Sequence, residues 1–218
     1  MNTSGEDLLI IGAWILGIGS VVEAIGQTQQ SLTSSDLGKD LIVKGNGIEA
    51  FGNSLQAIGR TKLFNPEYQQ LSQIYSIIGA WLEAAGNTAN SVGISIELSG
   101  EEEEGLKIDT LGSGIQGTGA AFEAFGGYIS EDSPFRSLNI TGNSLISLGS
   151  FLVAIGNIFI LQEHTEIGEI ILLVGGWIQV IGAFVLINAI TIEVESASAP
   201  VNDSGNPYSY HHYHFAHP

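Results

Sequence analysis

The amino-acid sequence predicts an all-α protein in which six helices form three tandem antiparallel hairpins, packed as a close bundle or palisade. Three observations lead to this prediction. Glycines recur at every seventh residue through long apolar stretches, the glycine pattern repeats after 67 residues, and polar linkers separate successive glycine series. Loop glycines would not keep this spacing through unbroken apolar periodicity, so each series indicates one helix.

The six expected helices follow from six glycine series in chain order. Of the 29 glycines in the chain, 22 belong to these series. The series cover residues 5–26, 38–59, 79–100, 105–126, 142–156 and 168–182, and the polar linkers cover residues 27–36, 59–67, 99–104, 129–134 and 162–166. Taken in pairs, the six helices make three helical hairpins.

A longer repeat relates the hairpins to one another. The string IGAW at residues 11–14 recurs at residues 78–81, and eight glycines of the first unit are again glycine 67 residues later. We therefore expect one repetitive domain over residues 1–194, with units of about 1–66, 67–133 and 134–194. Residues 195–218 depart from the repeat, and we expect them to form a disordered tail rich in His and Tyr.

The heptads give each helix two different faces. With glycine at position a, positions c, d and g are mostly large and apolar, positions e and b are mostly polar, and position f is mostly Ala or Gly. An interior glycine costs about 0.8–1 kcal/mol relative to alanine, so close packing of helices must offset that cost. The glycines predicted to pack helices together are Gly12, Gly19, Gly26, Gly45, Gly52, Gly79, Gly86, Gly112, Gly119, Gly149, Gly156, Gly175 and Gly182.

The sequence leaves open whether the apolar faces meet protein or lipid. Residues 138–162 and 170–192 contain no charged residue. The second stretch is about 34 Å long as a helix, enough to cross a hydrocarbon core of about 30 Å. The fifth and sixth helices are therefore candidates for membrane contact. The first four helices each carry a Glu near the middle, which would cost roughly 2.5–3.5 kcal/mol at a bilayer centre. This cost favours a soluble or peripheral bundle.

Composition excludes several classes of function. The net charge of −17 predicts repulsion from nucleic acid, and the absence of cysteine excludes disulfides and thiolate sites. The acidic start of the chain lacks the basic region of a signal peptide, so we expect a cytoplasmic or a spore- or envelope-associated protein. We identify no catalytic constellation and no cofactor motif, and expect no enzyme.

Three polar features are candidates for chemistry. The position e residues Glu23, Glu49, Glu83 and Glu123 are expected to form a solvated face, with a cation or proton path as the alternative in a membrane. The tail holds His211, His212, His214 and His217, which could bind zinc, copper or nickel, although incidental affinity is the favoured interpretation. The acidic run at residues 101–104 is expected to be a solvated loop, because it lacks a full calcium ligand set.

The strings IGAWILGIGSVVEAIGQT, IGAWLEAAGNT and GNGIEAFGNSLQAIGR resemble an uncharacterised repetitive protein family of Bacillus and its relatives. The resemblance covers residues of about 8–190 and implies a Gram-positive, spore-forming source. It implies no activity and no catalytic residues.

Two hypotheses for function follow. The first is a non-enzymatic structural protein that assembles with copies of itself in a spore or envelope setting. The alternative is a membrane-embedded helical-hairpin protein, such as a channel, a proteolipid or a membrane-active factor.

Overall fold

A computed structural model describes residues 4–33, 36–66 and 71–198, and within them it confirms the predicted fold class. Six α-helices follow one another along the chain. They are α1 (Gly5–Thr33), α2 (Asp36–Leu63), α3 (Leu71–Leu98), α4 (Glu102–Ile129), α5 (Arg136–Leu161) and α6 (Thr165–Ser198). The last helix therefore continues to Ser198, beyond the point where the sequence suggested that the tail begins.

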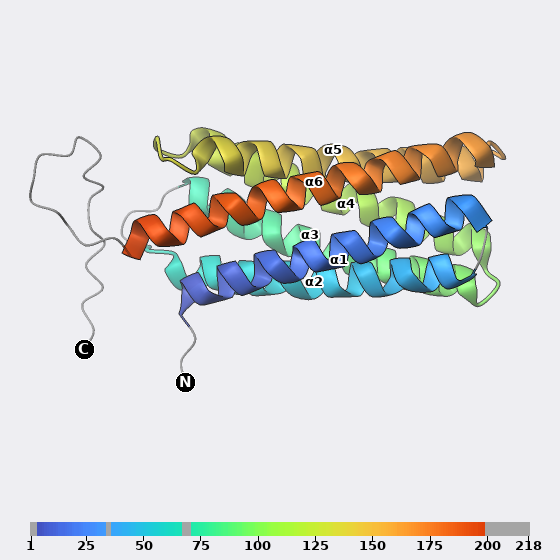
Figure 1. Ribbon diagram of the computed structural model, residues 1–218, viewed down its shortest axis with the longest axis horizontal. Coiled ribbons are helices and arrows are strands. Elements are labelled where there is room, and N and C mark those ends of the chain that lie inside the picture. The colour runs from blue at the N-terminus through green and yellow to red at the C-terminus, as the bar shows by residue number, and fades with distance from the viewer. Residues whose placement is uncertain (1–3, 34–35, 67–70, 199–218) are drawn as a thin grey trace, which may run out of the picture.

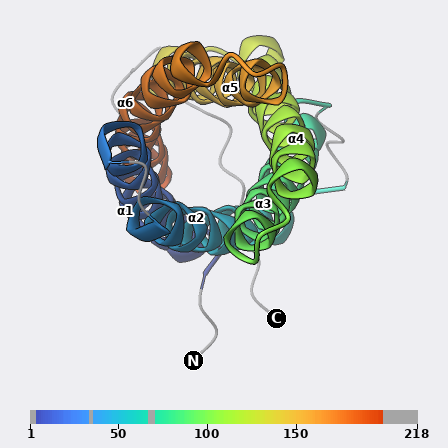
Figure 2. The ribbon, with the colours of Figure 1, turned by 90° about the vertical axis from the view of Figure 1, so that its right-hand side faces the viewer.

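The six helices form a closed ring (Figures 1 and 2). Helices α1 and α2, α3 and α4, and α5 and α6 pack as antiparallel hairpins, and α2 with α3 and α4 with α5 join the hairpins side by side. Helix α6 also packs against α1, so the row of helices closes on itself. We call the end where α1 begins and α6 ends the terminal end, and the opposite end the hairpin end.

Glycines bring the two helices of each hairpin into backbone contact. A Cβ atom on Gly12 would lie 2.6 Å from the carbonyl oxygen of Gly52, and a Cβ atom on Gly52 would lie 2.7 Å from that of Gly12. Gly79 and Gly119 make the same reciprocal approach, at 2.6 Å in both directions. For each of the thirteen glycines predicted to pack helices, an added Cβ would lie within 3.0 Å of backbone atoms of the partner helix. No larger residue fits these positions without separating the helices.

Hydrogen bonds join neighbouring hairpins at three interfaces. Ser91 Oγ donates to the carbonyl oxygen of Val43 at 3.1 Å and joins α3 to α2, while Ser147 Oγ donates to that of Gly117 at 2.8 Å and joins α5 to α4. Trp177 Nε1 donates to Thr28 Oγ1 at 3.1 Å, across the α6–α1 contact that closes the ring. Small residues allow this close approach. Gly17 of α1 faces Ile187 of α6, and Gly117 of α4 faces Phe151 of α5.

Two of the hairpin turns share one backbone geometry. In the α3–α4 turn, Gly100 has a φ of 100°, and Glu101 N–H donates to the carbonyl oxygen of Ile96. In the α5–α6 turn, Glu163 takes the place of Gly100 and has a φ of 65°. Here His164 N–H donates to the carbonyl oxygen of Phe159. Left-handed backbone suits glycine and costs other residues roughly 1–2 kcal/mol. The second turn therefore carries a strain that the first avoids.

The ring encloses the polar faces and exposes the apolar ones. Among the buried side chains are Glu23, Glu49, Glu83 and Glu123, none more than 4% exposed. The expectation that position e forms a solvated face is therefore wrong. Large apolar side chains at positions c and g, including Trp14, Ile18 and Phe51, lie on the outside instead.

Candidate functional site

The candidate site is the interior of the ring, which is lined by heptad positions e and b. Each glycine pair of a hairpin leaves space for the side chains that follow four residues later on both helices. The Cγ of Glu49 would lie 2.6 Å from a Cβ on Gly19, and Glu23 packs in the same way on Gly45. As a result, the two position e side chains of a hairpin meet inside the ring, over the glycines.

This geometry places carboxyl groups in pairs. The Glu23 and Glu49 carboxyl groups contact each other between α1 and α2, and those of Glu83 and Glu123 do so between α3 and α4. In the second pair, Arg60 Nη2 lies 3.1 Å from Glu123 Oε2 and supplies a positive charge. In the first pair, Glu23 accepts a hydrogen bond of 2.7 Å from Gln27 Nε2. Two ionised carboxylates in contact repel strongly where water is excluded, so each pair needs either a shared proton or a positive charge nearby.

A layer of hydrogen-bonded side chains crosses the interior at Gln116. Gln116 Nε2 lies 2.9 Å from Gln179 Oε1 of α6 and 3.5 Å from Glu49 Oε2 of α2. Ser150 of α5 donates to the same Gln179 oxygen at 3.0 Å, and Asn90 of α3 donates to Gln116 Oε1 at 3.3 Å. This polar layer, made of Glu49, Asn90, Gln116, Ser150 and Gln179, joins five helices and fills the centre of the ring with polar side chains.

One basic residue lies in the interior toward each end, and both come from α2. Toward the hairpin end, Lys39 Nζ lies 2.9 Å from Glu97 Oε2 and 3.9 Å from Glu102 Oε1. Toward the terminal end, Arg60 pairs with Glu123.

The long carboxylate-free stretches of α1, α5 and α6 allow an apolar cluster inside the ring at the terminal end. Its large buried members are Leu9, Leu16, Ile146, Leu186, Ile187 and Ile190.

Several buried polar atoms of the interior have no hydrogen-bond partner. They include Asn46 Oδ1, Glu49 Oε1, Gln56 Oε1 and both polar atoms of the Asn87 side chain. Buried polar groups are normally hydrogen-bonded, and an unsatisfied one is costly. The interior therefore has the chemistry of a site for water or ions. The sequence marked these residues as polar positions e and b, but it did not show that they face one another.

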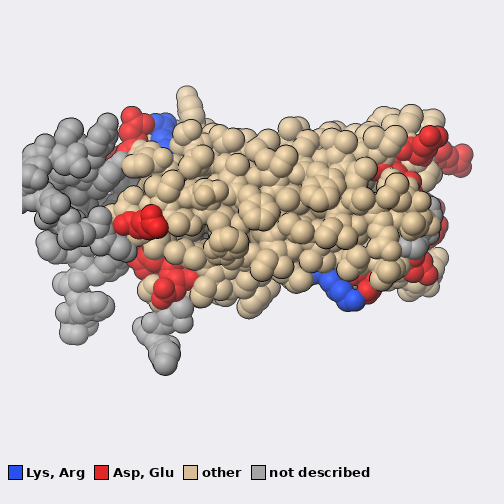
Figure 3. All heavy atoms as spheres, in the orientation of Figure 1, with Lys and Arg blue, Asp and Glu red and all other residues tan. Residues whose placement is uncertain are grey.

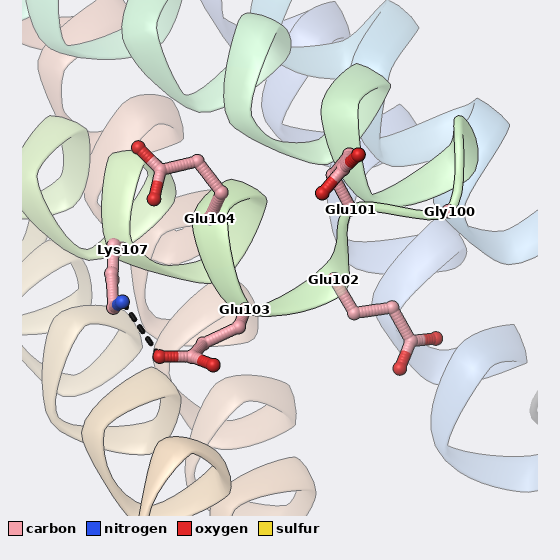
Figure 4. A pocket seen from close by; sticks show the side chains of 6 residues that line it. All are labelled: Gly100, Glu101, Glu102, Glu103, Glu104 and Lys107. Carbon is pink, nitrogen blue, oxygen red and sulfur yellow. Dashed lines mark hydrogen bonds and ion pairs between the residues drawn. The ribbon is translucent and has the colours of Figure 1, made fainter.

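The acidic run at the start of α4 surrounds a shallow surface pocket at the hairpin end (Figure 4). Its carboxylates point in different directions and do not converge, and Glu103 pairs with Lys107 at 2.6 Å. That hydrogen bond lowers the pKa of Glu103 below its usual value. Over the described residues, no group of three or more His, Cys, Asp or Glu side chains is placed to hold a metal ion. The four tail histidines lie outside the described residues.

On the face of the ring drawn in Figure 3, charged side chains gather toward the two ends and the middle is largely free of them. Exposed large apolar side chains occur on all six helices, and we call their set the outer belt. The outer belt includes Trp14, Ile18, Phe51, Ile58, Ile78, Trp81, Leu111, Phe125, Leu148, Phe151, Trp177 and Ile181. Three helices, α1, α5 and α6, are long and apolar enough to cross a membrane. A membrane location is therefore possible, and α1 joins the two helices singled out from the sequence.

Comparison with known proteins gives a family but no activity. A family model described as a family of unknown function (DUF6944) matches residues 7–187 and so reaches all six helices. The chain belongs to DUF6944. Neither a curated protein nor a solved structure matches it. Membership of DUF6944 confirms that the chain belongs to an uncharacterised family, while the link to Bacillus and its relatives stays a prediction.

Proposed function

We propose that this DUF6944 chain is an integral membrane protein of the channel or carrier class. The six helices cross the bilayer as a ring, the outer belt contacts lipid, and the interior provides a polar compartment within the hydrocarbon region that the apolar cluster closes toward the terminal end. One observation carries the proposal: every helix exposes large apolar side chains on the outside, while the carboxylates near mid-helix face inward. An apolar surface that surrounds a monomer completely fits a lipid annulus better than a single protein partner.

The dimensions of the ring suit a bilayer. A helix of 28 residues, such as α2, α3 or α4, is about 42 Å long, close to a bilayer of 40–45 Å with its headgroups. On α2 the exposed side chains of Lys44 and Lys62 are 18 residues apart, which is about 27 Å along the helix. Long lysine side chains at these positions reach the headgroup region, so the uncharged band nearly matches the hydrocarbon core.

Ring closure removes the main objection to a membrane location. Each charge exposed to lipid near the bilayer centre would cost roughly 2.5–3.5 kcal/mol. Glu23, Glu49, Glu83 and Glu123 avoid most of this cost because they face the polar interior. Small residues at the helix contacts also agree with membrane packing, where backbones approach through Gly, Ala and Ser.

A self-assembling structural protein is the second candidate, and the same outer belt favours it. In that case the exposed apolar side chains would pack against other copies of the chain, in a spore or envelope layer. The belt then becomes a protein interface rather than a lipid surface.

Cell fractionation separates the two proposals. Membranes from expressing cells are washed with alkaline carbonate, and the chain is followed in the wash and in the pellet. Retention in the pellet with release by detergent is expected for a membrane-spanning ring. Release by carbonate, or recovery as an assembly without detergent, would contradict the membrane proposal and favour self-assembly.

A further inference from the structure

The interior holds more buried carboxyl groups than basic groups. Among the described residues, six carboxyl side chains are buried: Glu23, Glu49, Glu83, Glu97, Asp109 and Glu123. Lys39 and Arg60 face this interior and pair with Glu97 and Glu123. Within the described part of the chain, no ion pair joins a basic side chain to Glu23 or Glu49. The Glu23–Glu49 pair therefore lacks a positive charge from the protein.

Unpartnered oxygen atoms lie around the same pair. Glu49 Oε1 is buried and accepts no hydrogen bond, and Asn46, one turn earlier on α2, has an unpartnered Oδ1. Asn87 of α3 is wholly buried beside Glu49, and both its Oδ1 and its Nδ2 are unpartnered, so a rotation of the amide turns either atom toward the pair. The amide nitrogen of Asn46 is not free to donate to Glu49 Oε1, since Asn46 Nδ2 already donates to the carbonyl oxygen of Ile42 at 3.0 Å. Carboxyl and amide groups from three helices thus gather at the Glu23–Glu49 pair.

We propose that Glu23, Glu49, Asn46 and Asn87 bind a monovalent metal cation of the sodium or potassium class inside the ring. The inference rests on the proposed function, because it gives the polar compartment its ligand. Carboxylate and amide oxygens are hard ligands that suit hard cations. With two carboxyl groups, the cluster lacks the larger carboxylate set typical of calcium sites and the substrate phosphates with which magnesium is usually bound.

The cation replaces contacts that the cluster otherwise lacks. It neutralises the repulsion between Glu23 and Glu49, and it accepts the lone pairs of the Asn46 and Asn87 side-chain oxygens. Gln27 and Gln116 hold the two carboxyl groups in place by donating to Glu23 at 2.7 Å and to Glu49 at 3.5 Å. The site is thus built by α1, α2 and α3, with orientation supplied from α4.

Thermal unfolding of the purified full chain in detergent tests this site. The midpoint temperature is measured in sodium, potassium and N-methylglucamine chloride at equal ionic strength and pH. We expect the midpoint to rise with the concentration of at least one alkali cation, because a ligand of the folded state stabilises it. N-methylglucamine is too large for the cluster and serves as the reference salt.

Two isosteric variants and one control identify the residues. Glu49→Gln removes the charge but keeps the shape, so we expect a higher midpoint in N-methylglucamine and at least a tenfold loss of apparent cation affinity. Asn87→Leu is expected to weaken cation affinity as well. Glu103→Gln, which changes an exposed carboxylate on α4, is the matched control and should leave the cation response unchanged.

Equal midpoints in all three salts would mean that a proton alone satisfies the pair and would overturn the inference. A cation response that survives in Glu49→Gln would also overturn it. Failure of the membrane proposal appears separately, as release by carbonate, and the same cation measurement is then made on the chain purified without detergent.

Discussion

Alanine substitutions at two neighbouring glycines of α4 test whether the heptad glycines hold each hairpin together. A Cβ on Gly112 would lie 2.8 Å from both the Asn90 nitrogen and the Gly86 carbonyl oxygen. A Cβ on Gly114, two residues further along, would have no atom of another helix within 4 Å. The two variants therefore share chemistry and helix but differ in packing.

The expected effects have opposite signs. At Gly114 the gain in helix propensity stabilises the fold by about 1 kcal/mol. At Gly112 the same gain is outweighed, because the obstructing atoms are backbone and cannot rotate away. Overpacking costs about 1–3 kcal/mol and occasionally more, and a rigid backbone contact belongs at the upper end. We expect a net loss of about 2 kcal/mol for Gly112→Ala.

Thermal unfolding followed by circular dichroism in detergent measures both variants. For a chain of this size, 1 kcal/mol shifts the midpoint by about 2–4 °C. Gly114→Ala should raise the midpoint by that amount, and Gly112→Ala should lower it by about 4–8 °C. A midpoint for Gly112→Ala equal to or above that of Gly114→Ala would refute the backbone-contact explanation of the heptads.

Three further predictions concern the turns and the interior. Glu163→Gly should raise the midpoint by about 2–4 °C, because it relieves the backbone strain of a left-handed residue, which is roughly 1–2 kcal/mol. Gly100→Ala should lower the midpoint, and no change in either variant would contradict the strain assigned to these turns. Arg60→Met should destabilise the fold by about 3–5 kcal/mol in urea unfolding, since it leaves Glu123 buried without its partner, whereas Lys107→Met at an exposed pair should cost at most about 1 kcal/mol. Leu16→Ala should cost about 2–5 kcal/mol by opening a cavity in the apolar cluster, and a loss below 1 kcal/mol would show that this cluster is loosely packed.

Much of the fold follows from the sequence because the heptads act locally. The spacing of Gly12, Gly19 and Gly26 predicted the helix and its contact line, and the six glycine series, taken in pairs, predicted the number of hairpins. The heptads did not directly predict whether the row of helices curves toward its polar face or toward its apolar face.

That curvature also has a basis in helix geometry. At 100° per residue, positions a and f lie about 140° apart across e and b, and about 220° apart across c, d and g. Neighbours in a six-membered ring subtend about 120°, so small contact residues at a and f turn the polar positions inward. The solvated-face interpretation failed because it assumed a flat row, in which Glu49 and its equivalents would reach water.

The contents of the interior were harder to predict. Whether Glu23 meets Glu49 depends on the register of two helices, which the glycine pairs set only once both are folded. The layer at Gln116 depends on four other helices and has no local signal at all.

The most direct test of the membrane ring is the environment of the outer belt in a lipid bilayer. The chain contains no cysteine, so single cysteines can carry a nitroxide label without background. Phe51→Cys, Leu111→Cys and Ile181→Cys place the label on α2, α4 and α6, at side chains that are 57–63% exposed. Ser99→Cys, in the exposed α3–α4 turn, is the control for an aqueous position.

Electron paramagnetic resonance in proteoliposomes then measures collisions of each label with oxygen, which concentrates in lipid, and with a water-soluble nickel chelate. We expect the three belt positions to show high oxygen and low nickel accessibility, and Ser99→Cys to show the reverse. Belt labels that collide with nickel as readily as Ser99→Cys, or that neither reagent reaches because another copy covers them, would contradict the membrane-embedded ring.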